Sequence, residues 1–212
     1  MNLEKERRIR PPGEEIFLIE GGVLRDLLYD EDIILIPEGC KEIGTAAFIN
    51  NLYIEQMSIP ATVHTIGPAA FSGCMYLRCI HFQEGLKVIG EDAFYLCSCL
   101  TEVSLPSTLC KLGQGCFQDT NLKSVRVPGH IGTIPKDAFA DNFALETVWL
   151  EEGITHIESG AFQNCPQLRD IYCPGSLKSI ADNAFENTPV KTVAAPGKWL
   201  IYRQDLVDRI MK

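Results

Sequence analysis

The fold is decided by a stretch that reads Leu100-Thr-Glu-Val-Ser-Leu-Pro-Ser-Thr-Leu-Cys-Lys-Leu-Gly-Gln-Gly-Cys-Phe117. Apolar and polar residues alternate up to Leu105, which is typical of a strand with one buried face. Pro106 ends that strand, because proline cannot donate a hydrogen bond to a strand ladder. Leu109 and Leu112 predict a second short extended segment, with both side chains pointing inward. After this segment the chain turns and reaches Phe117.

The same pattern occurs seven times along the chain, and its clearest marker is a phenylalanine. The spacings between successive phenylalanines are 23, 23, 23, 22, 23 and 23 residues. Alanine precedes the ring in every copy except one, where Cys116 stands. A unit this short cannot close a hydrophobic core alone, so the copies are expected to stack. The repeated residues are Phe48, Phe71, Phe94, Phe117, Phe139, Phe162 and Phe185.

These phrases resemble the BspA-type leucine-rich repeat. The resemblance rests on the stretch quoted above and on Ile66-Gly-x-x-Ala-Phe-x-x-Cys74 and Ile89-Gly-x-x-Ala-Phe-x-x-Cys97, and it covers about residues 33–196. It implies a non-enzymatic solenoid. Members of this family are often bacterial or protist surface proteins that act in adhesion and protein binding.

The expected fold is therefore an α/β repeat solenoid. We predict a right-handed, leucine-rich-repeat-like rod with parallel strands, short second strands and single helical turns, one turn carrying each Ala-Phe pair. The period lies within the range of about 20–29 residues that leucine-rich repeats use.

The chain is predicted to have four parts. Residues 1–13 form a flexible charged arm, in which Arg7, Arg8 and Arg10 are solvated. Residues 14–32 form an N-terminal cap hairpin that turns at Gly21-Gly22. Seven repeats of about 23 residues occupy 33–196. Residues 197–212 form a degenerate repeat and a C-terminal capping helix, with Trp199 and Tyr202 pointing inward, Val207 in the phenylalanine position and the helix over 204–211.

Charge and composition exclude several function classes. The chain has 19 basic and 28 acidic residues, a net charge of −9, whereas nucleic-acid binders usually carry a basic excess. Apolar runs such as Ile33–Ile36 are far short of the roughly 20 residues of a membrane span. The first residues are charged and do not resemble a secretory signal, so the expected location is the cytoplasm, where thiols stay reduced.

The chain has nine cysteines, an odd number. Cys74, Cys97 and Cys165 share one position, three residues after the phenylalanine, where a thiol is expected to bond a backbone group at the end of the turn. A disulfide between Cys74 and Cys97 stays open as an alternative. A zinc site would use Cys97-Ser-Cys99, but only one residue separates this pair and structural zinc sites prefer two to four. We therefore expect no metal and no cofactor.

Enzyme signals are weak. Gly113-x-Gly115 superficially resembles a phosphate-binding loop, yet its first glycine belongs to the repeat. The four histidines fall at different repeat positions and have no neighbour at metal or triad spacing. We expect no catalytic activity. The histidines are His64, His81, His130 and His156.

The strand period indicates where a partner would bind. Arg126, Trp149 and Tyr172 occupy the same exposed position in three successive copies, and these residue types are enriched at binding hot spots. The alternative is that a loop, a terminal arm or cross-strand stacking covers them. The candidate partner-binding residues are Arg126, Trp149, Tyr172, His81, Glu102, Thr147 and Asp170.

The sequence therefore predicts a monomeric module that binds an unknown protein or peptide on its strand face. A second hypothesis is a structural or self-assembling repeat protein. A third is a protein that depends on its thiols or on a metal.

Overall fold

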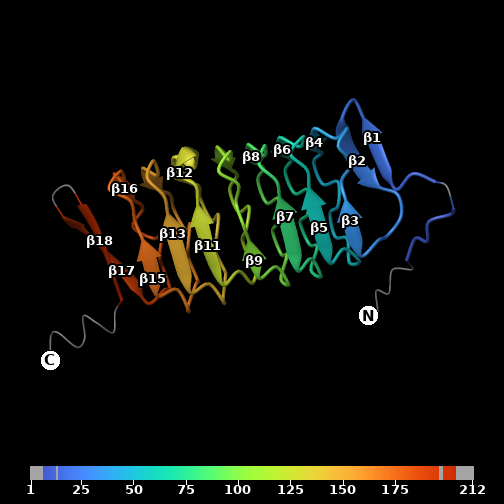
Figure 1. Cartoon of the computed structure of the whole chain (residues 1–212). Coiled ribbons are helices and arrows are strands. Elements are labelled where there is room, and N and C mark those ends of the chain that lie inside the picture. The colour runs from blue at the N-terminus through green and yellow to red at the C-terminus, as the bar shows by residue number, and fades with distance from the viewer. Residues whose placement is uncertain (1–6, 13, 196–197, 204–212) are drawn as a thin grey trace.

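The computed structural model describes residues 7–12, 14–195 and 198–203, with side chains described as far as Val190. Parallel strands stack in about seven turns of a β-solenoid, which runs from the blue end to the red end of Figure 1. The predicted repeat solenoid is confirmed.

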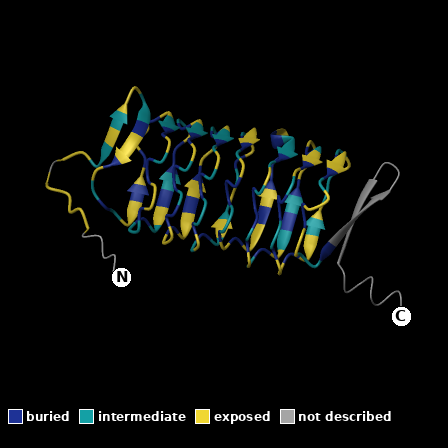
Figure 2. Ribbon diagram, turned by 180° about the vertical axis from the view of Figure 1, so that it is seen from behind, coloured by how far each residue is buried: buried dark blue, intermediate teal, exposed yellow. Residues whose placement is uncertain are grey.

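The first strands of the repeats form two parallel sheets. One sheet has the order β3-β5-β7-β9 and the other β11-β13-β15. Along these strands buried and exposed residues alternate, as Figure 2 shows, so each strand has one face in the core and one in solvent. Their bounds are β3 (Ile33–Leu35), β5 (Gln56–Ile59), β7 (Cys79–Phe82), β9 (Glu102–Val103), β11 (Ser124–Val127), β13 (Thr147–Leu150) and β15 (Asp170–Tyr172).

The second strands have two residues each and form a matching pair of sheets on the other side of the core. The larger sheet has the order β1-β2-β4-β6-β8-β10, in which β1 (Phe17–Glu20) and β2 (Val23–Leu27) precede the repeats, and the smaller sheet has the order β12-β14-β16. Their bounds are β4 (Glu42–Ile43), β6 (Thr65–Ile66), β8 (Val88–Ile89), β10 (Lys111–Leu112), β12 (Thr133–Ile134), β14 (His156–Ile157) and β16 (Ser179–Ile180).

Both sets of strands are interrupted at the same place. The first-strand sheets separate between β9 and β11, and the second-strand sheets separate between β10 and β12. The interruption falls between Phe117 and Phe139, the one pair that is 22 residues apart, so one residue is missing from the connection between these coils. A 3₁₀ helix, η1 (Gly129–Ile131), lies directly after β11.

The core is a continuous stack of the repeated phenylalanines. Their ring centroids lie 5.0 to 5.6 Å apart, and neighbouring planes agree within 7°. Five of the seven rings are fully buried, among them Phe71 and Phe117. Offset stacking of this kind adds to the free energy gained by burying apolar surface.

The expected helical turn around each Ala-Phe pair is wrong. In the second coil, the amides of Ala69, Phe71 and Gly73 donate to carbonyls of the next coil, each over 2.8 Å, while the amides between them bond three residues back. An α-helix needs all of these amides for its own bonds, so it cannot form here. Ala69 and Gly73 adopt positive φ, 51° and 74°, to direct alternate amides outward. Within the described residues, η1 is the only helical element.

These turns form a row of hydrogen bonds along the solenoid, here called the turn row. Each of the first five junctions between coils has three such bonds, and the sixth has two. The turn row crosses the interruption of the sheets, where Gly115, Phe117 and Asp119 donate to Lys136, Ala138 and Ala140 over 3.1, 2.9 and 3.0 Å. Where strand pairing stops, the two halves of the solenoid are therefore joined by the turn row, together with two bonds from the amides of Asn121 and Lys123 to the carbonyls of Leu100 and Thr101, each over 3.1 Å.

An antiparallel hairpin lies against the first coil. It consists of β1 (Phe17–Glu20) and β2 (Val23–Leu27), with Gly21 and Gly22 between them at positive φ. β2 pairs in parallel with β4. Carbonyls of Gly22 and Leu24 accept the amides of Lys41 and Gly44, each over 2.7 Å. The hairpin thus supplies acceptors for the amides on either side of β4 in the first coil.

The charged arm is not free at Arg7 and Arg8, which corrects the expectation of a solvated arm there. The Arg8 guanidinium pairs with Asp30 at 3.0 Å, and the Arg8 amide donates to the other Asp30 oxygen at 2.7 Å. The Asp30 side chain is only 4% exposed, so its charge depends on these contacts. Arg7 pairs with Asp32 at 2.9 Å, and its guanidinium lies over the Tyr53 ring, 5.7 Å from the centroid.

The last described strands, β17 (Val190–Ala195) and β18 (Lys198–Arg203), pair antiparallel in a sheet of their own. In the repeats, neighbouring strands are parallel, so the backbone of this last copy departs from the predicted repeat. The expected roles of the Trp199 and Tyr202 side chains, of Val207 and of the helix over 204–211 lie outside the described side chains and residues. The four-part division of the chain stays a prediction.

Candidate functional site: the strand face of the C-terminal half

The exposed face of β11, β13 and β15 carries a compact group of polar and aromatic side chains. Strand pairing places Arg126 opposite Trp149 and Trp149 opposite Tyr172. It also places Ser124, Thr147 and Asp170 in the parallel row two residues earlier. The six side chains form two rows of three, here called the aromatic patch, and they share one face because side chains alternate along a strand.

The row of Arg126, Trp149 and Tyr172 is a stack. The guanidinium carbon of Arg126 lies 5.5 Å from the centroid of the Trp149 ring. The Trp149 and Tyr172 centroids are 5.8 Å apart, with planes 4° from parallel. Parallel rings at that distance are offset, so each leaves part of its face uncovered by the other. Trp149 is half-buried, whereas Tyr172 is 56% exposed.

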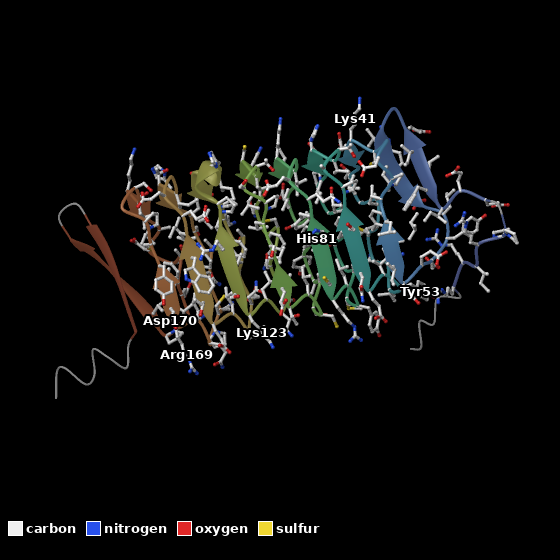
Figure 3. The ribbon with its side chains drawn as sticks, in the orientation of Figure 1. Lys41, Tyr53, His81, Lys123, Arg169 and Asp170 are labelled. Atoms are coloured by element: carbon white, nitrogen blue, oxygen red, sulfur yellow. The ribbon has the colours of Figure 1, made fainter. Side chains whose placement is uncertain are left out.

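The aromatic patch contains two charged side chains, Arg126 and Asp170, and only Arg126 is paired with an opposite charge among the described side chains. Arg126 has a counter-ion in Glu151, at 3.6 Å. Asp170 is exposed and has no hydrogen-bond or ion-pair partner for its carboxylate among the described side chains. The neighbouring Arg169, labelled with Asp170 in Figure 3, donates to Gln167 over 3.2 Å instead. The uncompensated charge in the patch is therefore negative.

The structure divides the seven predicted binding residues. Arg126, Thr147, Trp149, Asp170 and Tyr172 lie together in the aromatic patch. The other two do not join them, because they lie beyond the interruption, on the sheet β3-β5-β7-β9. These two are His81, which is opposite Ser58, and Glu102, which is opposite Cys79.

Two exposed apolar residues lie on the strand face of the other sheet, outside the predicted set. Ile33 and Leu35 of β3 are 62% and 69% exposed. They stand at the start of that sheet, opposite Gln56 and Ser58 of β5. The strand alternation used for the later copies would have found them if it had been applied to the first.

The thiols have structural partners. Sγ of Cys74, Cys97 and Cys165 donates to the carbonyls of Phe48, Phe71 and Phe139 over 3.1, 3.2 and 3.3 Å, which confirms the expected bond to a backbone group.

All nine cysteines are free. Burial raises the pKa of Cys74 and Cys165 to about 12, so these thiols stay protonated at neutral pH and are poor nucleophiles. No group of three or more His, Cys, Asp or Glu side chains in the described part of the chain could hold a metal ion.

A cavity of about 430 Å³ lies at the opposite end of the solenoid from the aromatic patch. Its walls come from the arm, the end of the hairpin and the turn of the first coil, including Arg8, Asp30 and residues 46–53. Asp30 is the one buried carboxylate there, and Arg8 already pairs with it. The cavity therefore does not contribute to the strand-face site.

The stacked parallel coils, the phenylalanine core and the exposed strand face define a leucine-rich-repeat solenoid. A family profile described as BspA type Leucine rich repeat region matches residues 31–146 and 100–204, with six copies. The chain belongs to this family, and leucine-rich repeat folds are generally non-enzymatic.

Solved structures agree with this assignment. A leucine-rich repeat protein of T. pallidum is 28% identical, with a TM-score of 0.69, over 71% of this chain and 73% of that one. A leucine-rich repeat protein of Bacteroides ovatus is 24% identical, with a TM-score of 0.64, over 85% and 56%. A leucine rich cell surface protein of Faecalibacterium prausnitzii is 23% identical, with a TM-score of 0.66, over 86% and 57%. A search of curated proteins found no match.

Among the described residues, no helix has the length and hydrophobicity to cross a membrane.

Proposed function

We propose that the chain is a non-catalytic module that binds a protein or peptide on the strand face of its C-terminal half. The stack of Arg126, Trp149 and Tyr172 carries this proposal. Arginine and aromatic residues provide most of the binding energy in many interfaces. Exposed aromatic surface bordered by polar groups often marks an interaction site.

The support of the aromatic patch also suits binding. The central strand, β13, is hydrogen-bonded to β11 on one side and to β15 on the other. The buried residues of these strands belong to the same hydrophobic core as the phenylalanine stack. Stacking already restricts the rotamers of Arg126, Trp149 and Tyr172. A partner therefore meets a preorganised surface, and less conformational entropy is lost on binding. Family membership adds adhesion as the biological setting that we propose for this contact.

A peptide-retention experiment tests the proposal. The full chain is immobilised, a random 12-residue peptide library is passed over it, and retained peptides are counted by sequencing. We expect Trp149→Ala combined with Tyr172→Ala to abolish most retention. The matched control is Ile33→Ala combined with Leu35→Ala, which also removes exposed apolar surface from the strand face but at the other end. This control is expected to keep retention.

Thermal unfolding separates loss of binding from loss of fold. The stacked pair contributes about 0.5–1.5 kcal/mol, so the double variant at 149 and 172 should stay folded with a small decrease in the melting temperature. Unchanged retention together with a large loss of stability would show that the pair serves the fold and refute the proposal. Light scattering after size exclusion tests the expected monomer.

A further inference from the structure

The aromatic patch ends at Tyr172, with the Asp170 carboxylate beside it, and we propose that these two side chains bind an arginine side chain of the partner. This inference rests on the proposed function and adds to it the chemistry of the bound group.

The first coil already contains the same arrangement within the chain. There the guanidinium of Arg7 lies over the Tyr53 ring, 5.7 Å from its centroid, and pairs with Asp32 at 2.9 Å. An arginine is thus held between a tyrosine ring and an aspartate. A guanidinium suits such a site because it is planar, stacks on aromatic faces and pairs with a carboxylate.

Within the aromatic patch, one aromatic ring already has an arginine stacked on it. Arg126 stacks on Trp149, and Trp149 stacks on Tyr172. Tyr172 is the last member of this row among the described side chains, and it is 56% exposed. A guanidinium from the partner can stack on the exposed part of the Tyr172 ring, as Arg126 stacks on Trp149.

The position of Asp170 supplies the counter-ion. Asp170 precedes Tyr172 by two residues on β15, so both side chains point to the same face, about 7 Å apart along the strand. One guanidinium can contact the ring and the carboxylate together at that spacing. The alternative cation, Arg126, is paired with Glu151 at 3.6 Å. The net charge of −9 also favours approach of a cationic partner.

The experiment uses three pools of 12-residue peptides with random flanks and one fixed central residue: arginine, its neutral isostere citrulline, or lysine. Each pool is passed over the immobilised full chain. We expect the arginine pool to be retained about fivefold more than the citrulline pool, because citrulline lacks the positive charge and so loses both the cation–π attraction and the exposed ion pair. The lysine pool should fall between them, because lysine pairs with a carboxylate but lacks the planar group.

Variants assign the preference to its residues. Asp170→Asn removes the ion pair but leaves the Tyr172 ring, so the ratio of arginine to citrulline retention should fall from about fivefold to about twofold. The control Glu102→Gln neutralises an exposed carboxylate of the same face across the interruption and should leave the ratio unchanged. Circular dichroism of each variant confirms that it is folded.

The outcomes separate this inference from the proposed function. In one outcome, the double variant Trp149→Ala and Tyr172→Ala loses retention of every pool, but the wild-type chain retains the arginine and citrulline pools equally. The binding function then stands, and the arginine site is wrong. A fivefold ratio that survives Asp170→Asn, or equal retention of arginine and lysine pools, also overturns the assignment. Retention that is the same in wild type and double variant refutes the binding function itself.

Discussion

Replacement of Phe117 by alanine tests whether the turn row holds the two halves of the solenoid together. Phe117 is fully buried and stacks on Phe94 at 5.1 Å and on Phe139 at 5.6 Å. Removal of a buried phenylalanine costs about 3–5 kcal/mol. Phe71→Ala is the matched control, because Phe71 is equally buried and stacks on both neighbours at 5.0 Å. Chemical denaturation should therefore give similar losses of unfolding free energy for the two variants.

Hydrogen exchange should distinguish the two variants locally. Around Phe71, strand pairs join the coils on both sides of the core. Around Phe117, no strand pairs join β9 to β11 or β10 to β12, and two bonds, from Asn121 to Leu100 and from Lys123 to Thr101, stand in their place. Opening of the turn row at residues 115–119 is therefore resisted by fewer bonds than at residues 69–73. We expect Phe117→Ala to increase exchange in its own turn far more than Phe71→Ala does in its turn, measured by mass spectrometry of peptides that cover each segment. Equal increases would refute the conclusion that the turn row is the main connection at the interruption.

Two further predictions concern packing and pH. Gly129→Ala should lower the free energy of unfolding by about 2 kcal/mol or more, because the new Cβ would lie 1.7 Å from the Glu152 carbonyl oxygen. The control is Gly39→Ala, whose Cβ meets nothing within 4 Å. It should change the free energy of unfolding by less than about 0.5 kcal/mol in the same denaturation assay. Burial raises the pKa of Cys165 from 9.0 to about 12, so above pH 9 the unfolded chain releases a proton that the folded chain keeps, and stability falls as pH rises toward 12. Each such thiol contributes up to about 1.4 kcal/mol per pH unit, and Cys165→Ala should make the decline between pH 9 and 10.5 shallower; an unchanged slope would contradict the role of burial.

The repeat could be predicted from the sequence because its signal is periodic. A phenylalanine every 22 or 23 residues requires stacked coils, and strand alternation within these coils predicts that Arg126, Trp149 and Tyr172 lie side by side. Both inferences depend on residue type and spacing alone. The stacking of these three residues follows from their adjacency on neighbouring strands.

The rest depends on hydrogen bonds between residues that are distant in sequence. The Ala-Phe segment has residues compatible with a helical turn, but the neighbouring coil takes alternate amides, as at Ala69 and Phe71. The ion pair between Arg8 and Asp30 spans 22 residues, and no local pattern indicates it. Likewise, the sequence shows that one residue is missing after Phe117, but it does not show that strand pairing stops there.

The turn row gives the two ends of the solenoid different chemistry. All of its bonds run from an amide to a carbonyl of the next coil. The first coil consequently presents the carbonyls of Thr45, Ala47 and Ile49, and the last presents the amides of Phe185 and Asn187, none of which has a backbone partner among the described residues. The middle coils thus both donate to and accept from this row, each joining the coil before it to the coil after it. The ends are not interchangeable: a cap grafted onto the first coil must offer donors to this row, and one grafted onto the last must offer acceptors.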